Sequence, residues 1–133
     1  MKINKYNKKL GGVKMPKNVD DEIHEFINKI QEILGKRLKK VILYGSYARG
    51  DYNKKSDVDI MILTDLSFEE IESYRDKISD VAYDIELNTG IIISPIIKNI
   101  EKYNSRINFV PFYKNVEKEG VVLVNGQWNY RKF

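Results

Sequence analysis

Two aspartates, Asp57 and Asp59, stand one residue apart at the head of an apolar run that ends at Leu63. Because successive side chains of a strand alternate between its two faces, a strand over this run points both carboxylates the same way. Their backbone positions then lie roughly 6.6 Å apart. Two like charges beside a hydrophobic core are costly unless a counter-charge lies between them. The pattern predicts a strand whose one face carries a site for a hard divalent cation.

A short apolar strand over 41–44 leads directly into Gly45 and Ser46, and Arg49 follows three residues later. Gly45 permits a tight turn with close approach to a ligand. Ser46 offers a hydroxyl and, at the start of a short helix, free backbone N–H groups that suit a phosphate. Arg49 adds a guanidinium fork. Each feature alone fits an ordinary loop, or a strand end with solvated or lysine-paired aspartates. Together they predict a nucleotide phosphate site.

The hydrophobic periodicity predicts helices that alternate with strands. The expected helices run from Asp20 or Asp21 to near Gly35, over 67–88 and over 112–119, and the expected strands are 41–44, 57–63, 91–97 and 121–124. Asp20 or Asp21 is the expected cap of the first helix, and Gly90 ends the second. Pro95 places the third strand at a sheet edge or ends it. The order predicts an α+β fold: a small mixed β-sheet covered on one side by helices.

The length of 133 residues gives room for one domain, which we expect over 20–133. Residues 1–19 carry six lysines and no acid, which predicts an irregular basic N-terminal arm. A second basic cluster lies at 36–40. The formal net charge of +4 fits a solvated surface. It also suits an anionic partner such as a nucleotide, RNA or an acidic protein, so nucleic acid stays open as a partner.

The chain has no cysteine and a single histidine, His24. Thiolate sites and histidine clusters are therefore excluded, and any metal must be bound by oxygen, which favours magnesium, manganese or calcium. No apolar run approaches the roughly 18–20 residues of a membrane span, so no membrane segment is expected. The lysine-bearing start lacks the apolar core of a signal peptide. The absence of cysteine also fits a cytoplasmic protein, which is our expectation.

Three segments, Gly45-Ser46, Ala48-Arg49-Gly50 and Ser56-Asp57-Val58-Asp59, resemble the signature of nucleotidyltransferases of the DNA polymerase beta superfamily. The size and the closing segment 111–120 narrow the resemblance to the minimal nucleotidyltransferase (MNT) proteins, the antitoxin partners of HEPN-domain toxins. The resemblance implies a polymerase beta-like fold and an NTP substrate, ATP in the first place. It implies that Asp57 and Asp59 are catalytic and hold Mg²⁺ or Mn²⁺. It also implies that the nucleotide is bound by Gly45, Ser46, Arg49 and Ser56.

The superfamily places a third carboxylate on a neighbouring strand, which helps to activate the attacking hydroxyl. The corresponding strand here, 91–97, contains no acid. Asp84 and Glu86 are close in sequence, but they belong to the helix expected before Gly90. Three interpretations stay open: one of these helix-borne acids substitutes, the partner supplies the base, or catalysis is weak or lost.

The resemblance implies transfer of a nucleoside monophosphate, AMP from ATP, to a hydroxyl of a partner protein, which in the MNT family is a tyrosine of the HEPN toxin. One alternative is a catalytically weak or inactive MNT-fold binding protein that neutralises a HEPN toxin by contact. Another is a small-molecule transferase of the antibiotic-modifying type, which the short C-terminal region disfavours. Tyr47 and Tyr52 flank the motif and either pack into the fold or stack on a base.

Overall fold

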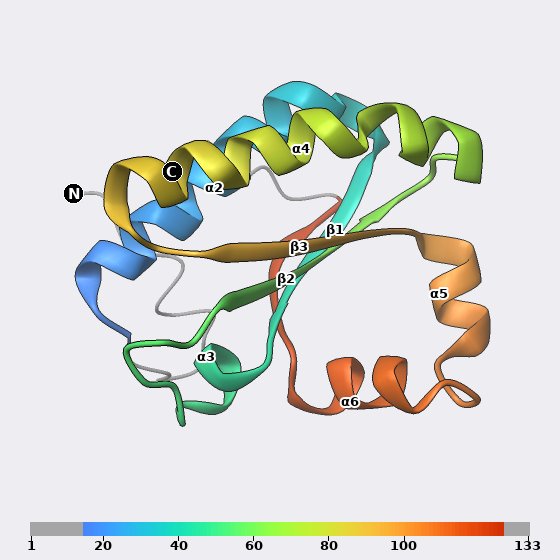
Figure 1. Cartoon of the computed structure of the whole chain (residues 1–133). Helices are drawn as coiled ribbons and strands as arrows, with labels where there is room; N and C mark the ends of the chain where they lie inside the picture. Colours follow the sequence, from blue (N-terminus) through green and yellow to red (C-terminus); the bar gives the residue numbers. More distant parts are fainter. Residues whose placement is uncertain (1–14, 127–133) are drawn as a thin grey trace.

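The computed structural model describes residues 15–126 and confirms the α+β class (Figure 1). Its elements are α2 (Lys17–Leu34), the 3-10 turn η1 (Gly35–Arg37), β1 (Leu38–Tyr44), α3 (Ser46–Arg49), β2 (Val58–Thr64), α4 (Phe68–Thr89), β3 (Ile93–Asn99), α5 (Ile100–Arg106), α6 (Pro111–Glu119) and β4 (Val121–Asn125). The strand order is β3-β2-β1-β4. β2 runs parallel to β3, and β1 runs antiparallel to β2 and β4, so the sheet is mixed.

Helices cover both faces of this sheet, whereas the sequence predicted one covered face. Alternate side chains of β2, such as Ile60, pack into the main core with α2 and α4. The intervening side chains, Met61 and Leu63, pack with Tyr103 of α5 and Val116 of α6 on the opposite face. Figure 1 shows α2 and α4 on one side of the sheet and α5 and α6 on the other. The helix α5 was missed because it buries Tyr103 alone, which leaves no apolar stripe in its sequence.

The first helix begins earlier than predicted. α2 begins at Lys17 after Pro16, which makes no side-chain capping bond, so neither Asp20 nor Asp21 is its cap. Pro16 has a ψ of 142°, outside the helical region, so the helix begins at the next residue. Residues 17–19, expected in the basic arm, therefore belong to α2. The rest of that arm, up to residue 14, lies outside the described residues.

The ends of α4 and the position of β3 follow from local chemistry. Ser67 and Glu70 form a reciprocal capping box at the start of α4. Gly90 ends the helix with a φ of 81°, in the left-handed region, as predicted. Pro95 lies in β3, which is an edge strand, also as predicted. The central strands are therefore β1 and β2, and they carry the segments singled out in the sequence.

The two longest described helices are amphipathic. α2 and α4 each place a row of apolar side chains in the main core and leave charged side chains exposed. Within residues 15–126, no helix is long and apolar enough to cross a membrane.

Candidate nucleotide site

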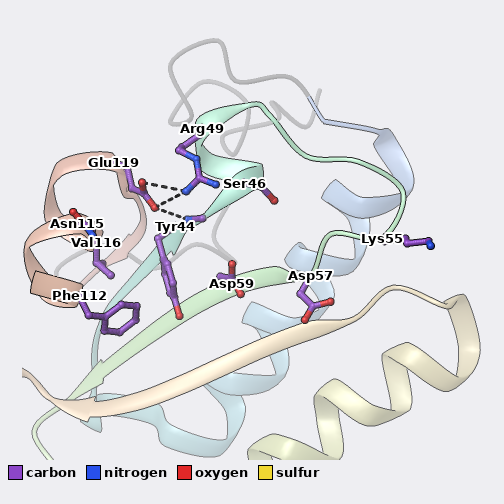
Figure 2. Close-up of a pocket in the computed structure, with 11 residues that line it drawn as sticks. Tyr44, Ser46, Arg49, Lys55, Asp57, Asp59, Phe112, Asn115, Val116 and Glu119 are labelled. Atoms are coloured by element: carbon purple, nitrogen blue, oxygen red, sulfur yellow. Dashed lines mark hydrogen bonds and ion pairs between the residues drawn. The ribbon is translucent and has the colours of Figure 1, made fainter.

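A cavity of about 530 Å³ opens where β1 leads into α3 (Figure 2). This volume lies within the range of roughly 300–1,000 Å³ typical of small-molecule sites. Two walls enclose it. The motif wall comprises Tyr44, Gly45, Ser46, Arg49, Lys55, Asp57 and Asp59, and the α6 wall comprises Phe112, Asn115, Val116 and Glu119.

Most of the sequence-predicted residues meet at this cavity. Those that line it are Gly45, Ser46, Arg49, Asp57 and Asp59. Ser56 does not line it. The Ser56 hydroxyl instead accepts a hydrogen bond of 2.9 Å from the backbone N–H of Asn53, so this side chain closes the loop before β2.

The two aspartates concentrate negative charge at the end of β2. Asp57 precedes the strand and Asp59 lies in it, and both line the cavity. Burial raises the pKa of Asp59, and the charge of Asp57 raises it further, while Arg49 acts in the opposite direction. Burial and the neighbouring Asp57 thus both disfavour the ionised form of Asp59, and Arg49 offsets them only in part.

The donor set of the cavity fits a nucleotide-bound magnesium ion. Asp57 and Asp59 offer carboxylate oxygens, the ligands that Mg²⁺ and Mn²⁺ prefer. Among the described residues, no group of three or more histidine, cysteine or acidic side chains is arranged to hold a metal. Magnesium usually binds one or two carboxylates and completes its shell with phosphate and water. A pair of aspartates beside a phosphate-binding turn therefore suits Mg²⁺ that arrives with a nucleotide.

Gly45 brings the turn against the carboxylate of Asp59. Its φ of 78° lies in the region that favours glycine. A Cβ at this position would overlap Oδ2 of Asp59. Glycine at this position therefore allows the turn to lie directly against Asp59, while the approach to a ligand that the sequence predicted for Gly45 stays a prediction.

Glu119, at the end of α6, is the site residue that the sequence reasoning missed. Its Oε2 accepts a hydrogen bond of 3.0 Å from the backbone N–H of Gly45. Arg49 Nη1 donates to Oε1 at 3.2 Å and to Oε2 at 3.1 Å (Figure 2). Arg49 Nε donates to Asp51 Oδ2 at 3.2 Å. The guanidinium expected to meet a triphosphate is therefore bound to two carboxylates of the chain.

The position of Glu119 follows from the turn that joins α6 to β4. A Cβ at Gly120 would overlap the backbone oxygen of Val116 and Cγ2 of Ile42. Glycine therefore lets the end of α6 lie directly against β1, the strand that leads to Gly45. The sequence signal for Glu119 was its place just before Gly120 in the closing segment, but that signal does not state what the side chain contacts.

Neither the neighbouring strand β3 nor the helix-borne acids Asp84 and Glu86 add a third carboxylate to the cavity. Ser94 of β3 lies beside Asp59 in the parallel register, so the neighbouring strand presents a hydroxyl there. Asp84 and Glu86 belong to α4. Asp84 lines a separate cavity between α2 and α4, and Glu86 does not line the nucleotide cavity.

The tyrosines near the motif have distinct environments. Tyr47 is buried, and its ring stacks on Tyr52 with centroids 4.5 Å apart and planes 10° apart, so these two pack together and do not line the cavity. Tyr44 pairs with Asp59 in the sheet register and lines the cavity. Burial and the charge of Asp59 raise the pKa of Tyr44 to about 12, so its phenol stays protonated at neutral pH.

Comparison with known proteins supplies the family. The family model described as "Nucleotidyltransferase domain" matches residues 23–128. "Putative protein adenylyltransferase MJ0604" of Methanocaldococcus jannaschii is 40% identical over 80% of this chain and 98% of its own length. "Putative protein adenylyltransferase MJ0141" of the same organism is 42% identical over 74% of this chain and 92% of its own length.

A solved structure titled "Crystal structure of the toxin-antitoxin with AMP-PNP" aligns with a TM-score of 0.49 at 17% identity, over 76% of this chain and 72% of that one. A likeness this distant adds nothing to what the family model and the relatives show. Because the family model spans most of the described fold and both relatives match along nearly their whole length, the chain belongs to the nucleotidyltransferase domain family, as its resemblance to the minimal nucleotidyltransferases predicted.

Proposed function

We propose that this nucleotidyltransferase transfers AMP from ATP to a hydroxyl of a partner protein, with Mg²⁺ held by Asp57 and Asp59. The observation that carries the proposal is the meeting of these two carboxylates and the Gly45-Ser46 turn in one cavity. Both relatives carry the name "putative protein adenylyltransferase", which supports ATP as the donor and a protein as the acceptor.

The Gly45-Ser46 turn and the two aspartates of the motif wall have separate parts in this reaction. The Ser46 hydroxyl and the backbone of the turn bind the β- and γ-phosphates. Asp57 and Asp59 would hold the divalent ion, which would supply charge neutralisation at the α-phosphate. The acceptor oxygen forms a bond to the α-phosphorus, the bond to the β-phosphate bridging oxygen breaks, and pyrophosphate leaves. The hydroxyl proton passes to water or to a base of the partner, since Asp84 and Glu86 lie elsewhere.

We further propose a HEPN-domain protein as the partner, with a tyrosine as the acceptor. The support is the resemblance to the MNT proteins together with the protein-directed names of the relatives. The open cavity mouth is compatible with an acceptor delivered by another protein.

Differential labelling tests the transfer. The chain is incubated with Mg²⁺, a co-expressed HEPN protein, and ATP labelled with ³²P at either the α- or the γ-phosphate. Adenylylation predicts label on the HEPN protein from α-labelled ATP, none from γ-labelled ATP, and none with Asp59→Asn. Label from γ-labelled ATP would instead indicate phosphorylation, and label that persists in Asp59→Asn would remove Asp59 from the reaction.

A second candidate is a binding protein that neutralises its partner by contact. Two observations favour it: Ser94 stands beside Asp59 where an acid is expected, and Arg49 is bound to Glu119. This candidate predicts that the wild-type chain binds and silences the HEPN protein without transferring label, and that Asp59→Asn silences it equally well. The transferase predicts that silencing requires Asp59 and ATP.

A further inference from the structure

The four residues of the α6 wall form one face of the helix. Their spacing from Phe112 to Glu119 is three, one and three residues, which places their side chains along a single stripe. The chemistry changes along this stripe. The carboxylate of Glu119 meets the turn and Arg49 at one end, and the ring of Phe112 meets Tyr44 at the other (Figure 2). One end of the wall therefore faces the phosphate donors and the other is apolar.

Phe112 is a fixed ring with uncovered surface. Its ring lies 5.5 Å from that of Tyr44 with the planes at 78°, an edge-to-face contact that holds it in place. It is nevertheless 40% exposed, while Tyr44, the other ring that lines the cavity, is 8% exposed. An uncovered aromatic face beside a nucleotide site is a platform on which a base can stack.

Asn115 stands three residues after Phe112 on the same stripe and is exposed. Within residues 15–126, no hydrogen bond engages its side chain. A carboxamide carries one acceptor and two donors, and it matches adenine in a bidentate manner through the amino group and N7 of the base. Guanine presents two acceptors at the same edge, so the amide oxygen would face a guanine oxygen.

We propose that Phe112 and Asn115 form the adenine site, in which the ring of Phe112 stacks on the base and the amide of Asn115 selects adenine over guanine. This inference rests on the proposed function, because the base lies beyond the α-phosphate that Asp57 and Asp59 orient. Asp59 is paired with Tyr44 across the sheet, and Tyr44 contacts Phe112, so the platform adjoins the reacting phosphate. The α6 wall thereby sets the nucleotide preference of a site whose motif wall binds phosphates.

Calorimetric titrations that separate the base from the phosphates test this site. The ligands are ATP, GTP and inorganic tripolyphosphate, each with Mg²⁺, and the proteins are wild type, Phe112→Leu and Asn115→Ala. Phe112→Leu keeps apolar contact with Tyr44 but removes the planar face, so ATP affinity falls about tenfold while tripolyphosphate affinity stays within about twofold. Asn115→Ala lowers the preference for ATP over GTP by at least about fivefold.

Phe109→Leu is the matched control, because Phe109 is 81% exposed near the start of α6 and does not line the cavity. It should leave all three affinities unchanged. Unchanged ATP affinity in Phe112→Leu, or an equal loss of tripolyphosphate binding, would overturn the stacking platform, and an unchanged ATP-to-GTP ratio in Asn115→Ala would overturn the selection. A wild-type chain that binds neither ATP nor tripolyphosphate would instead contradict the proposed function itself.

Discussion

The two walls of the cavity are built in different ways. The motif wall comes from one continuous segment, 44–59, in which a strand, a tight turn and a second strand place the polar groups by local backbone geometry. The α6 wall comes from a distant helix, and its residues reach the cavity because α6 packs on the sheet through Val116. A wall made by a continuous turn has a compact sequence signature, whereas a wall made by a packed helix face does not.

The acidic side chains of the two walls also differ in their electrostatic surroundings. Asp59 on the motif wall has a pKa raised by burial and by Asp57, so a nearby positive charge would stabilise its ionised form. Glu119 on the α6 wall accepts hydrogen bonds from the Gly45 N–H and from Arg49. The first acid is therefore suited to a metal ion, and the second already occupies donors that a phosphate would use.

Gly45→Ala should have the largest effect, because Gly45 is the position in the motif wall where the backbone lies against Asp59. The added Cβ overlaps Asp59 Oδ2, and the φ of 78° is unfavourable for alanine. We expect a loss of about 1–3 kcal/mol in the free energy of unfolding and loss of Mg²⁺-dependent ATP binding. Gly50→Ala is the matched control, since Gly50 has a φ of 89° but open space around it. If both variants retained ATP binding equally, the close approach to Asp59 would have no functional part.

Gly120→Ala is the corresponding test of the α6 wall. A Cβ there overlaps the Val116 backbone oxygen and Ile42 Cγ2, so α6 has to move away from β1. Overpacking of this kind costs about 1–3 kcal/mol, which denaturant unfolding measures directly. Stability equal to wild type would show that α6 is not held against β1 as closely as the structure has it.

Glu119→Gln should have a smaller effect, and unlike Gly45→Ala it should strengthen ligand binding. The amide still accepts a hydrogen bond from the Gly45 N–H, but it no longer forms an ion pair with Arg49 or repels a triphosphate. An exposed ion pair contributes at most about 1 kcal/mol, so we expect tripolyphosphate binding to tighten by about two- to fivefold. Weaker binding in calorimetry would mean that Glu119 positions Arg49 for the nucleotide and does not compete with it.

Asp84→Asn and Glu86→Gln should have the smallest effects. Neither side chain lines the cavity, so each variant should change the rate of adenylyl transfer by less than about threefold, well below the 10²–10⁴ of a general base. A drop of a hundredfold in the labelling rate of either variant would require α4 to supply the base.

Much of the motif wall could be predicted from the sequence because its geometry is local. The turn at Gly45 and the lining of one cavity by both Asp57 and Asp59 depend on steric rules within a few residues. Glu119 and Phe112 could not be assigned, because their roles depend on how α6 packs against β1. The second covered face of the sheet was missed for a related reason: α5 buries Tyr103 alone, so its amphipathic pattern is weak.

ATP titration with and without Mg²⁺ tests most directly whether Asp57 and Asp59 bind a divalent ion together with the nucleotide. Magnesium favours sites completed by phosphate, so wild type should bind ATP much more tightly with Mg²⁺ than without it. The double variant Asp57→Asn, Asp59→Asn should lose this difference while it keeps a cooperative thermal unfolding transition. Equal affinity of the double variant and wild type for ATP in the presence of Mg²⁺ would contradict the assignment of the site.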